Sequence, residues 1–311
     1  MNLSTSNSKK TKGGRKIFSF RPLIACLLLL ALYQILIFGG VIPSSDGINQ
    51  WQSNVIQAQR YWYDRSKDSQ LVMVGSSLMA NIPAETMGKK VINLGMAGGC
   101  TQTGLEIVAR SNQTPEIVLA EINDTLERQR DRDLLASLNH PLLSPLRRYF
   151  AIFREEYKPI SVLVSLLRGS DREEDIEIED IEVANIEVEE ESDLSSELRE
   201  QEIERLVREN NISLPPNLKI LLEGEASQIE QQVKALEQKG IRVVFVDIPR
   251  ETEVTKTPRQ QEVASLMRSL FPPSRYDWFE VPVGQWRTSD GLHLIPKEVN
   301  RYTLLLRQYL F

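Results

Sequence analysis

An uninterrupted apolar run near the N-terminus constrains this chain more than any other feature. Residues 22–42 are 21 consecutive positions without a charged side chain, and a helix of that length crosses the apolar core of a bilayer. Six Lys or Arg residues and no acidic residue precede the run, so residues 1–21 are expected to stay in the cytoplasm. The sequence therefore predicts a single-pass protein of the cytoplasmic (inner) membrane, with the C-terminal part of the chain outside the cytoplasm.

Two other interpretations of this run remain open. A cleaved signal peptide is one, and the small residues Gly39 and Gly40 near the end of the run favour it. The run is long for a signal peptide and lacks an A-x-A-like cleavage site, so we favour a retained anchor. A buried helix of a soluble core is the other, and it fits poorly because no face of the helix is polar.

Charge is distributed unevenly over the 311 residues, whose formal net charge is −6. Residues 171–210 contain 18 acidic residues and four arginines, and we interpret 169–210 as a solvated, mobile, low-complexity insertion in which 194–210 form an exposed helix. Without this insertion and the basic tail, the chain is close to neutral. That balance argues against a nucleic-acid partner.

Short apolar segments with strand character begin after residue 69, each ending in a Gly, Pro, Asn or Asp turn signal, at 71–75, 90–95, 116–123 and 241–249. Helices are expected between and after them, at 77–88, 100–111, 226–240 and 296–310. Apolar strands that alternate with helices predict an α/β domain over residues 69–311, with a doubly wound, mostly parallel sheet and helices on both faces.

A separate helix is expected in residues 43–68, between the apolar run and the first strand. Trp51, Val55, Ala58 and Trp62 share one helical face in this segment. Its aromatic side chains fit either the membrane interface or packing against the domain. We interpret 43–68 as a juxtamembrane linker.

Ser77 and His293 are the residues that point to catalysis. Ser77 follows the first strand, and the ends of parallel strands are where ligands bind in doubly wound sheets. A serine hydroxyl becomes a nucleophile when a base removes its proton. Of the two histidines, His140 lies in a proline-rich loop and is expected at the surface, whereas His293 follows Asp290 by three positions. That spacing allows the carboxylate to orient the imidazole.

Donors for a developing oxyanion are expected at Ser77 itself and at two further positions. The backbone N–H groups of Ser77 and Gly95 and the side-chain amide of Asn123 follow three neighbouring strands. A glycine at position 95 lets the backbone approach a substrate closely.

The order of these residues resembles the SGNH (GDSL-like) hydrolase superfamily. The matching blocks are VMVGSSLMA (72–80), INLGMAGG (92–99), EIND (121–124) and DGLH (290–293). The resemblance implies a three-layer α/β fold and a serine esterase or O-acyltransferase that acts on ester-linked acyl groups without a cofactor. It also implies Ser77 as nucleophile, Asp290 and His293 as its partners, and Ser77, Gly95 and Asn123 as the oxyanion hole.

Two residues depart from the family pattern. Ser76 stands where the family usually has Asp, and Glu121 where it usually has Gly. With an N-terminal anchor, Gly-Ser-Ser looks like the branch that contains the teichoic-acid D-alanyl transfer and alginate O-acetylation proteins. This branch implies an acylated small molecule, lipid or glycan of the cell envelope as substrate, and a possible envelope-complex partner. Glu121 puts the usual substrate geometry in doubt.

Several alternatives remain. Ser76 is the fallback nucleophile, Cys100 is a less favoured thiol candidate, and Glu121 with Asp124 is a less favoured carboxylate pair for glycoside cleavage. One isolated His and one Asp-x-x-His do not make a closed metal site, so no metal is expected. A catalytically silent SGNH-like binding or assembly component is the main rival to an enzyme. An unrelated flavodoxin-like domain is the third reading.

Overall fold

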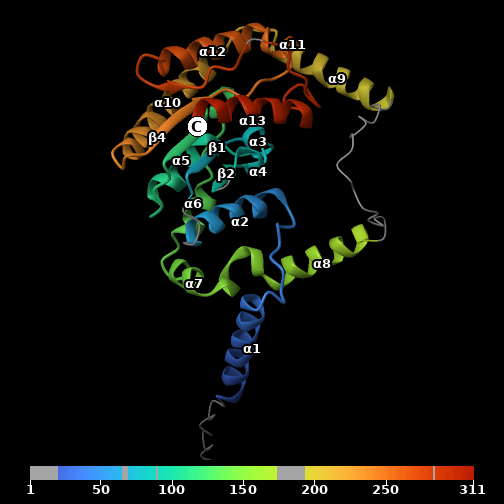
Figure 1. The fold of residues 1–311 in the computed structure, drawn as a ribbon, viewed down its shortest axis with the longest axis vertical. Coiled ribbons are helices and arrows are strands. Elements are labelled where there is room, and N and C mark those ends of the chain that lie inside the picture. Colours follow the sequence, from blue (N-terminus) through green and yellow to red (C-terminus); the bar gives the residue numbers. More distant parts are fainter. Residues whose placement is uncertain (1–19, 65–68, 89, 174–192, 283) are drawn as a thin grey trace, which may run out of the picture. The chain divides into compact units, whose positions relative to one another are not determined.

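The chain divides into two units, residues 1–43 and 44–311. The computed structural model describes residues 20–64, 69–88, 90–173, 193–282 and 284–311 (Figure 1). The first unit contains α1 (Arg21–Phe38), a helix that is long and apolar enough to cross a membrane. This helix covers most of the predicted run 22–42 and ends where Gly39 and Gly40 follow it.

The second unit combines one parallel sheet with helices. Its strands are β1 (Leu71–Gly75), β2 (Val91–Gly95), β3 (Ile117–Glu121), β4 (Arg242–Val246) and β5 (Asp277–Trp278). Its α-helices are α2 (Gln50–Tyr63), α3 (Ser77–Ala80), α4 (Ala84–Met87), α5 (Thr101–Arg110), α6 (Arg132–Leu138), α7 (Leu143–Tyr149), α8 (Pro159–Glu173), α9 (Asp193–Asn210), α10 (Pro216–Glu237), α11 (Thr252–Thr255), α12 (Pro258–Leu270) and α13 (Pro296–Leu310). Short 3₁₀ turns are η1 (Asp124–Glu127), η2 (Ala151–Phe153) and η3 (Glu155–Tyr157).

The sheet has the strand order β2-β1-β3-β4-β5, and every pair of neighbouring strands is parallel. Chain order reverses between β1 and β3, because β2 lies on one side of β1 and β3 on the other. In doubly wound sheets, this reversal point at the carboxyl ends of the strands is where ligands bind. The α/β class predicted from the sequence is confirmed, and the described sheet is wholly parallel.

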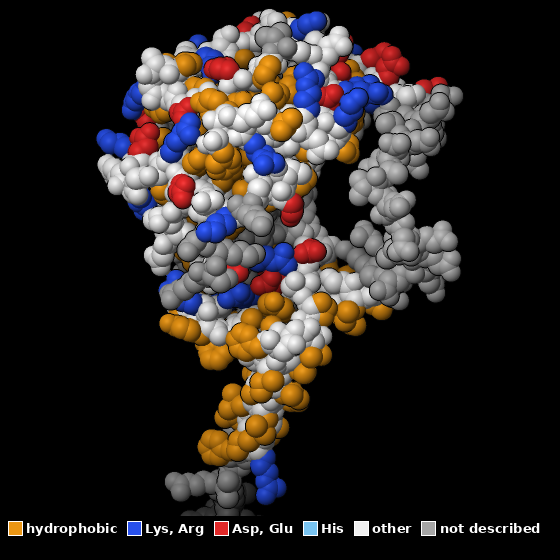
Figure 2. Space-filling view, viewed as in Figure 1, with side chains coloured by type: hydrophobic (Ala, Val, Ile, Leu, Met, Phe, Trp, Pro, Cys, Tyr) orange, Lys and Arg blue, Asp and Glu red, His pale blue; other side chains and the backbone are white. Residues whose placement is uncertain are grey.

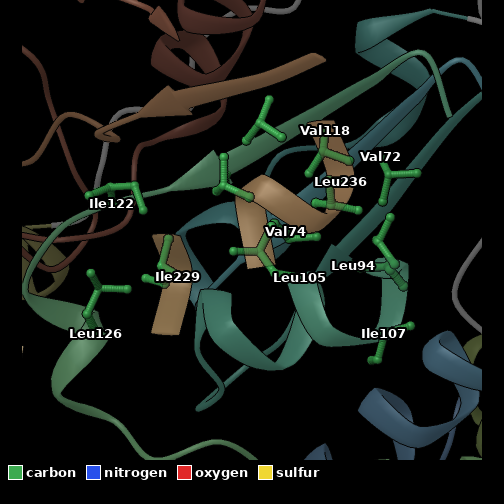
Figure 3. Packing of buried hydrophobic residues seen from close by; sticks show 14 of the residues in the cluster. Val72, Val74, Leu94, Leu105, Ile107, Val118, Ile122, Leu126, Ile229 and Leu236 are labelled. Atoms are coloured by element: carbon green, nitrogen blue, oxygen red, sulfur yellow. The ribbon is translucent and has the colours of Figure 1, made fainter. Parts of the chain in front are cut away.

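Side chains alternate between two buried clusters, one on each face of the sheet, because successive residues of a strand point to opposite faces. Val72 and Val74 of β1 pack with α5 and α10 in the first cluster, which Figure 3 shows. Leu71 and Met73 of β1 pack in the second cluster, against α3, α4 and α13. The sheet is therefore covered on both faces, and the strand side chains that face these two clusters are apolar for that reason.

The four predicted strands are present, and two of them end earlier than the sequence indicates. β3 stops at Glu121 and β4 at Val246, before the predicted ends at residues 123 and 249. The helix predicted over 226–240 is the C-terminal half of α10, which begins at Pro216 because proline fits the first position of a helix. β5, with only two residues, has no sequence signal.

Helix α8 extends into the segment that the sequence predicts as an insertion and ends there at Glu173. Helix α9 covers the expected 194–210, but it packs against α11 and buries Leu206, so it is only partly exposed. The acidic residues 174–192 lie outside the described residues.

Helix α2 packs within the second unit. Val55 and Ala58 are buried as the predicted face requires, and Tyr61 and Tyr63 are buried with them. Trp51, which was placed on the same face, is about half exposed. Packing against the domain is therefore the role of most of these aromatic side chains.

Candidate active site

Ser77 Oγ lies 3.1 Å from His293 Nε2, and His293 Nδ1 lies 2.6 Å from Asp290 Oδ2. Ser77 is the first residue of α3, directly after β1 and at the reversal point of the sheet. His293 is 216 positions later in the chain. The structure thus brings together the three side chains that the sequence nominated, in the order hydroxyl, imidazole, carboxylate.

The Asp290 carboxylate is held by its own turn. Its Oδ1 accepts the backbone N–H groups of Leu292, at 3.0 Å, and of His293, at 2.8 Å. Partial burial acts to raise the pKa of Asp290, but hydrogen bonds from the His293 side chain and from these two N–H groups outweigh it and lower the pKa to about 2. The carboxylate is therefore ionised at neutral pH and stabilises a protonated imidazole.

A second set of hydrogen bonds holds the turn that contains Asp290 and His293. Thr288 Oγ1 accepts the N–H of Gly291 at 2.9 Å and donates to Glu251 Oε2 at 2.7 Å. Arg199 of α9 donates to the same Glu251 oxygen and to the carbonyl of Thr288, both at 2.6 Å. The position of His293 thus depends on α9, a role that the sequence did not indicate.

Ser76 occupies a different environment from Ser77. Its side chain is fully buried, accepts the N–H of Leu78 at 3.2 Å and caps α3. The Ser76 hydroxyl and N–H each donate to Glu121, both at 2.8 Å. Ser76 is therefore engaged in positioning the start of α3, and it has no imidazole partner among the described residues.

Glu121 lies in the space that a side chain at position 75 would fill. A Cβ built on Gly75 would be 2.4 Å from Glu121 Oε2 and 2.6 Å from Met79 Cβ. Glu121 is fully buried and accepts hydrogen bonds from Ser76 and Asn123. The two departures from the family pattern, Ser76 and Glu121, are thus in direct contact and compensate each other.

Asn123 faces carboxylates in this structure. Its Nδ2 donates to Glu121 Oε1 at 2.9 Å and, over a longer 3.3 Å, to Asp247 Oδ1. Burial is the main cause that raises the pKa of Asp247 to about 6, and nearby Glu121 acts in the same direction. For Asn123 to bind an oxyanion, its amide must give up the longer of these contacts.

Gly95, which the sequence predicts as an oxyanion donor, has a structural role. Its N–H donates to Asn93 Oδ1 at 2.6 Å, and a Cβ there would be 2.4 Å from the backbone nitrogen of Ala80. Asn93 also donates to the carbonyls of Met79 and Ile82, each at 2.8 Å. Gly95 and Asn93 together hold α3 against β2. The N–H of Ser77, at the open start of α3, is the expected donor without an intrahelical acceptor.

A small cavity of about 80 Å³ opens beside Ser77, and Thr125, Arg128, Arg250 and Leu292 contribute to its wall. Arg250 is buried and forms an ion pair with Asp124, which also accepts from Gln260 at 2.8 Å. Burial acts to raise the pKa of Asp124, but Arg250 outweighs it and lowers that pKa. Asp124 is therefore an ionised wall residue held by Arg250, which does not suit the protonated general acid of a glycoside-cleaving pair.

A larger cavity of about 440 Å³ shares Arg250 with this one and is lined by Asp247, Lys256 and Trp286 among others. Neither Ser77 nor His293 lines it. We assign the chemistry to the smaller cavity, because that cavity contains the hydroxyl.

The remaining candidate residues lie elsewhere. His140 is exposed, and its Nδ1 accepts the N–H groups of Leu142 and Leu143, both at 3.3 Å. Cys26 is exposed and Cys100 buried, both as free thiols, and burial raises the pKa of the Cys100 thiol. In the described part of the chain, no three His, Cys, Asp or Glu side chains are grouped so as to hold a metal ion.

The arrangement can activate a hydroxyl for attack on a carbonyl. His293 is placed to accept the Ser77 proton, and Asp290 is placed to stabilise the resulting imidazolium. No family model matches the chain, and no curated protein is similar to it.

Proposed function

We propose that this protein is a membrane-anchored serine esterase or O-acyltransferase of the SGNH type. The hydrogen-bonded series from Ser77 Oγ through His293 to Asp290 is the observation that carries the proposal. Its location at the reversal point of a doubly wound sheet supports the same reading, because ligands reach that edge.

The proposed reaction has two steps. His293 takes the proton of Ser77 as Oγ attacks an ester carbonyl, and the ester C–O bond breaks when His293 returns that proton to the leaving alkoxide. The acyl group is then on Ser77. Water or a sugar hydroxyl, deprotonated by His293, attacks the acyl-serine and restores the free hydroxyl. Water makes the protein an esterase, and a sugar hydroxyl makes it an acyltransferase.

Oxyanion stabilisation in this proposal begins with the N–H of Ser77, with Asn123 as the second donor once its contact to Asp247 is released. A single such donor contributes roughly 10²–10³-fold to the rate of acyl transfer. Gly95 contributes by holding α3 in place.

We further propose that α1 is a retained anchor in the cytoplasmic membrane, with unit 2 on the far side of it. The charge-free helix and the basic residues before it support this topology. A tethered enzyme of this type would act on acylated lipid or glycan of the cell envelope. The alternative is a silent SGNH-like component of an envelope complex, which is favoured by the engagement of Gly95 and Asn123 as donors within the chain.

Labelling with a fluorophosphonate tests the proposal. We expect covalent labelling of the full-length protein in detergent, and complete loss of labelling in Ser77→Ala. Ser227→Ala, which removes an exposed hydroxyl on α10 that donates to the carbonyl of Glu223, is the matched control and should label as the unaltered chain does. If the folded wild-type protein remains unlabelled, the silent binding component is the better reading.

A further inference from the structure

Helices α7 and α8 leave large apolar side chains in contact with solvent. On α8, Ile160, Leu163, Leu166 and Leu167 are each more than half exposed, and their spacing places them on one face of the helix. The opposite face is held by the domain, because Val162 is buried and Ser161 Oγ accepts from Gln52 Nε2 at 2.6 Å. The exposed face is thus a fixed surface.

Exposed apolar side chains of α7 extend this surface. Leu142 and Tyr149 are more than two-thirds exposed. Helix α7 packs on η2, η2 on η3, and η3 on α8, so the two helices form one side of the unit. Figure 1 shows α7 and α8 at the same edge of unit 2, and Figure 2 shows hydrophobic side chains along that edge. The α7–α8 face is defined here by Leu142, Tyr149, Ile160, Leu163, Leu166 and Leu167.

The chain itself attaches this face to the end of α1. Ser45 is the second residue of unit 2 and is fully buried. Its N–H donates to the carbonyl of Glu156 at 2.9 Å, and its Oγ is hydrogen-bonded to Ser165 Oγ of α8 at 2.8 Å. Ser45 is seven positions after Phe38, which limits their distance to roughly 25 Å even in a fully extended chain.

The composition of the face fits a lipid surface. Interfacial helices place Leu and aromatic side chains on one side and Lys or Arg beside them, where they reach the headgroups. Lys158 is exposed directly before α8, and Arg148 is half-buried next to Tyr149. Soluble surfaces rarely collect this many apolar side chains without a partner.

We propose that the α7–α8 face lies in the headgroup region of the membrane that α1 crosses, so that unit 2 contacts the lipid at a second site. This inference rests on the proposed anchoring by α1. The contact fixes the orientation of unit 2 relative to the bilayer, which a single flexible tether does not.

Fluorescence quenching in vesicles tests this contact. The full-length protein, with Cys26 changed to Ala, is reconstituted in phosphatidylcholine–phosphatidylglycerol vesicles. An environment-sensitive dye is attached to Ile160→Cys or Leu163→Cys. Ile220→Cys on α10 is the matched control, because Ile220 and Ile160 are 69% and 71% exposed. Buried Cys100 remains unlabelled. We expect lipids with a spin label high on the acyl chain to quench positions 160 and 163 at least twofold more than position 220.

A label on native Cys26 tests the proposed anchoring by α1 separately from the proposed lipid contact of the α7–α8 face. Cys26 lies in α1 and should be quenched by lipids with the spin label deep in the acyl chain. If Cys26 is quenched while positions 160 and 163 behave as position 220 does, the face proposal is overturned and the anchor stands. If Cys26 is not quenched, both fall. Shielding of 160 and 163 that follows protein concentration and not lipid quencher identifies a second copy as the occupant and also overturns the proposal.

Discussion

Ser76 and Ser77 are neighbours in the chain, yet their hydroxyls have opposite surroundings. Ser77 is partly exposed and lies 3.1 Å from an imidazole, whereas Ser76 is fully buried and donates to the carboxylate of Glu121 at 2.8 Å. A carboxylate that accepts from a serine holds it in place, and a neutral imidazole can take its proton. The partner and the solvent access, rather than the residue type, separate the two roles.

Asp290 and Asp247 also differ in their surroundings. Asp290 is partly exposed, and N–H donors from His293 and Leu292 lower its pKa to about 2, so it is charged at neutral pH. Asp247 is half-buried near Glu121, and its pKa is raised to about 6. The turn that bears His293 is thus charged and accessible, whereas Ser76, Glu121 and Asn123 are buried together.

The largest expected effect comes from replacing each of the two serines in turn by alanine. Ser77→Ala should lower the rate of fluorophosphonate labelling by at least about 10³-fold, because the nucleophile is gone. Ser76→Ala should keep labelling within about tenfold but reduce the free energy of unfolding by about 1–2 kcal/mol, since the helix cap and one hydrogen bond to Glu121 are lost. Labelling rates and urea unfolding measure the two effects. Loss of labelling in Ser76→Ala alone would reverse the assignment.

Removal of the buried carboxyl group of Glu121 should lower the free energy of unfolding. Glu121→Ala leaves the N–H and hydroxyl of Ser76 without their acceptor and the amide of Asn123 with only its longer contact to Asp247, and we expect a loss of about 3 kcal/mol in the free energy of unfolding. Glu127→Ala, whose side chain is partly exposed, is the matched control and should change it by less than about 1 kcal/mol. Equal effects in urea unfolding would show that the cluster does not stabilise the fold.

The raised pKa of Asp247 predicts a stability that depends on pH. The unfolded chain ionises this carboxyl near its ordinary pKa of about 3.9, but the folded chain keeps the proton until about pH 6. This group therefore makes the protein less stable as pH rises from 4 to 6, with the full cost above pH 6.

Asp247→Asn cannot ionise and can still accept from Asn123. It should be more stable than the wild type by roughly 2 kcal/mol at pH 8 and equal to it at pH 4. Thermal unfolding across this range measures the difference. A gap that does not change with pH would mean that Asp247 ionises as easily in the folded chain as in the unfolded one.

The smallest effect is expected at α9. Arg199→Ala removes a hydrogen bond to the carbonyl of Thr288 and one to Glu251, which itself accepts from Thr288, and we expect labelling to slow by about tenfold while the unfolding temperature falls by only a few degrees. Arg205→Ala, on the same helix, loses only contacts to Glu202 and Glu209 and should leave labelling unchanged. If both variants label equally slowly, α9 acts through its general stability and not through Arg199.

The sheet and the three nominated side chains followed from local patterns. Apolar strands that end at Gly75 and Gly95 are visible in the sequence, and parallel strands must place their ends at one edge. The Asp-x-x-His spacing likewise reports a single turn. These features depend on residues that are close in sequence, which is why the sequence indicates them.

The residues that hold the turn of His293 in place have no such local sequence pattern. Arg199, Glu251 and Thr288 meet from three distant segments, and none of them has a local signature. Gly95 and Asn123 were read as oxyanion donors, but their hydrogen bonds go to Asn93 and to two carboxylates. Which acceptor a donor finds is decided by tertiary packing, and one sequence does not specify it.

The missing Cβ at Gly75 has a consequence for how this site can change. The side chain of Glu121, on the neighbouring strand β3, fills the volume that a side chain at position 75 would need. Its carboxyl group also accepts from the N–H and hydroxyl of Ser76, the next residue along the chain. Substitutions at 75, 76 and 121 are therefore coupled, and a larger residue at position 75 requires a smaller one at position 121.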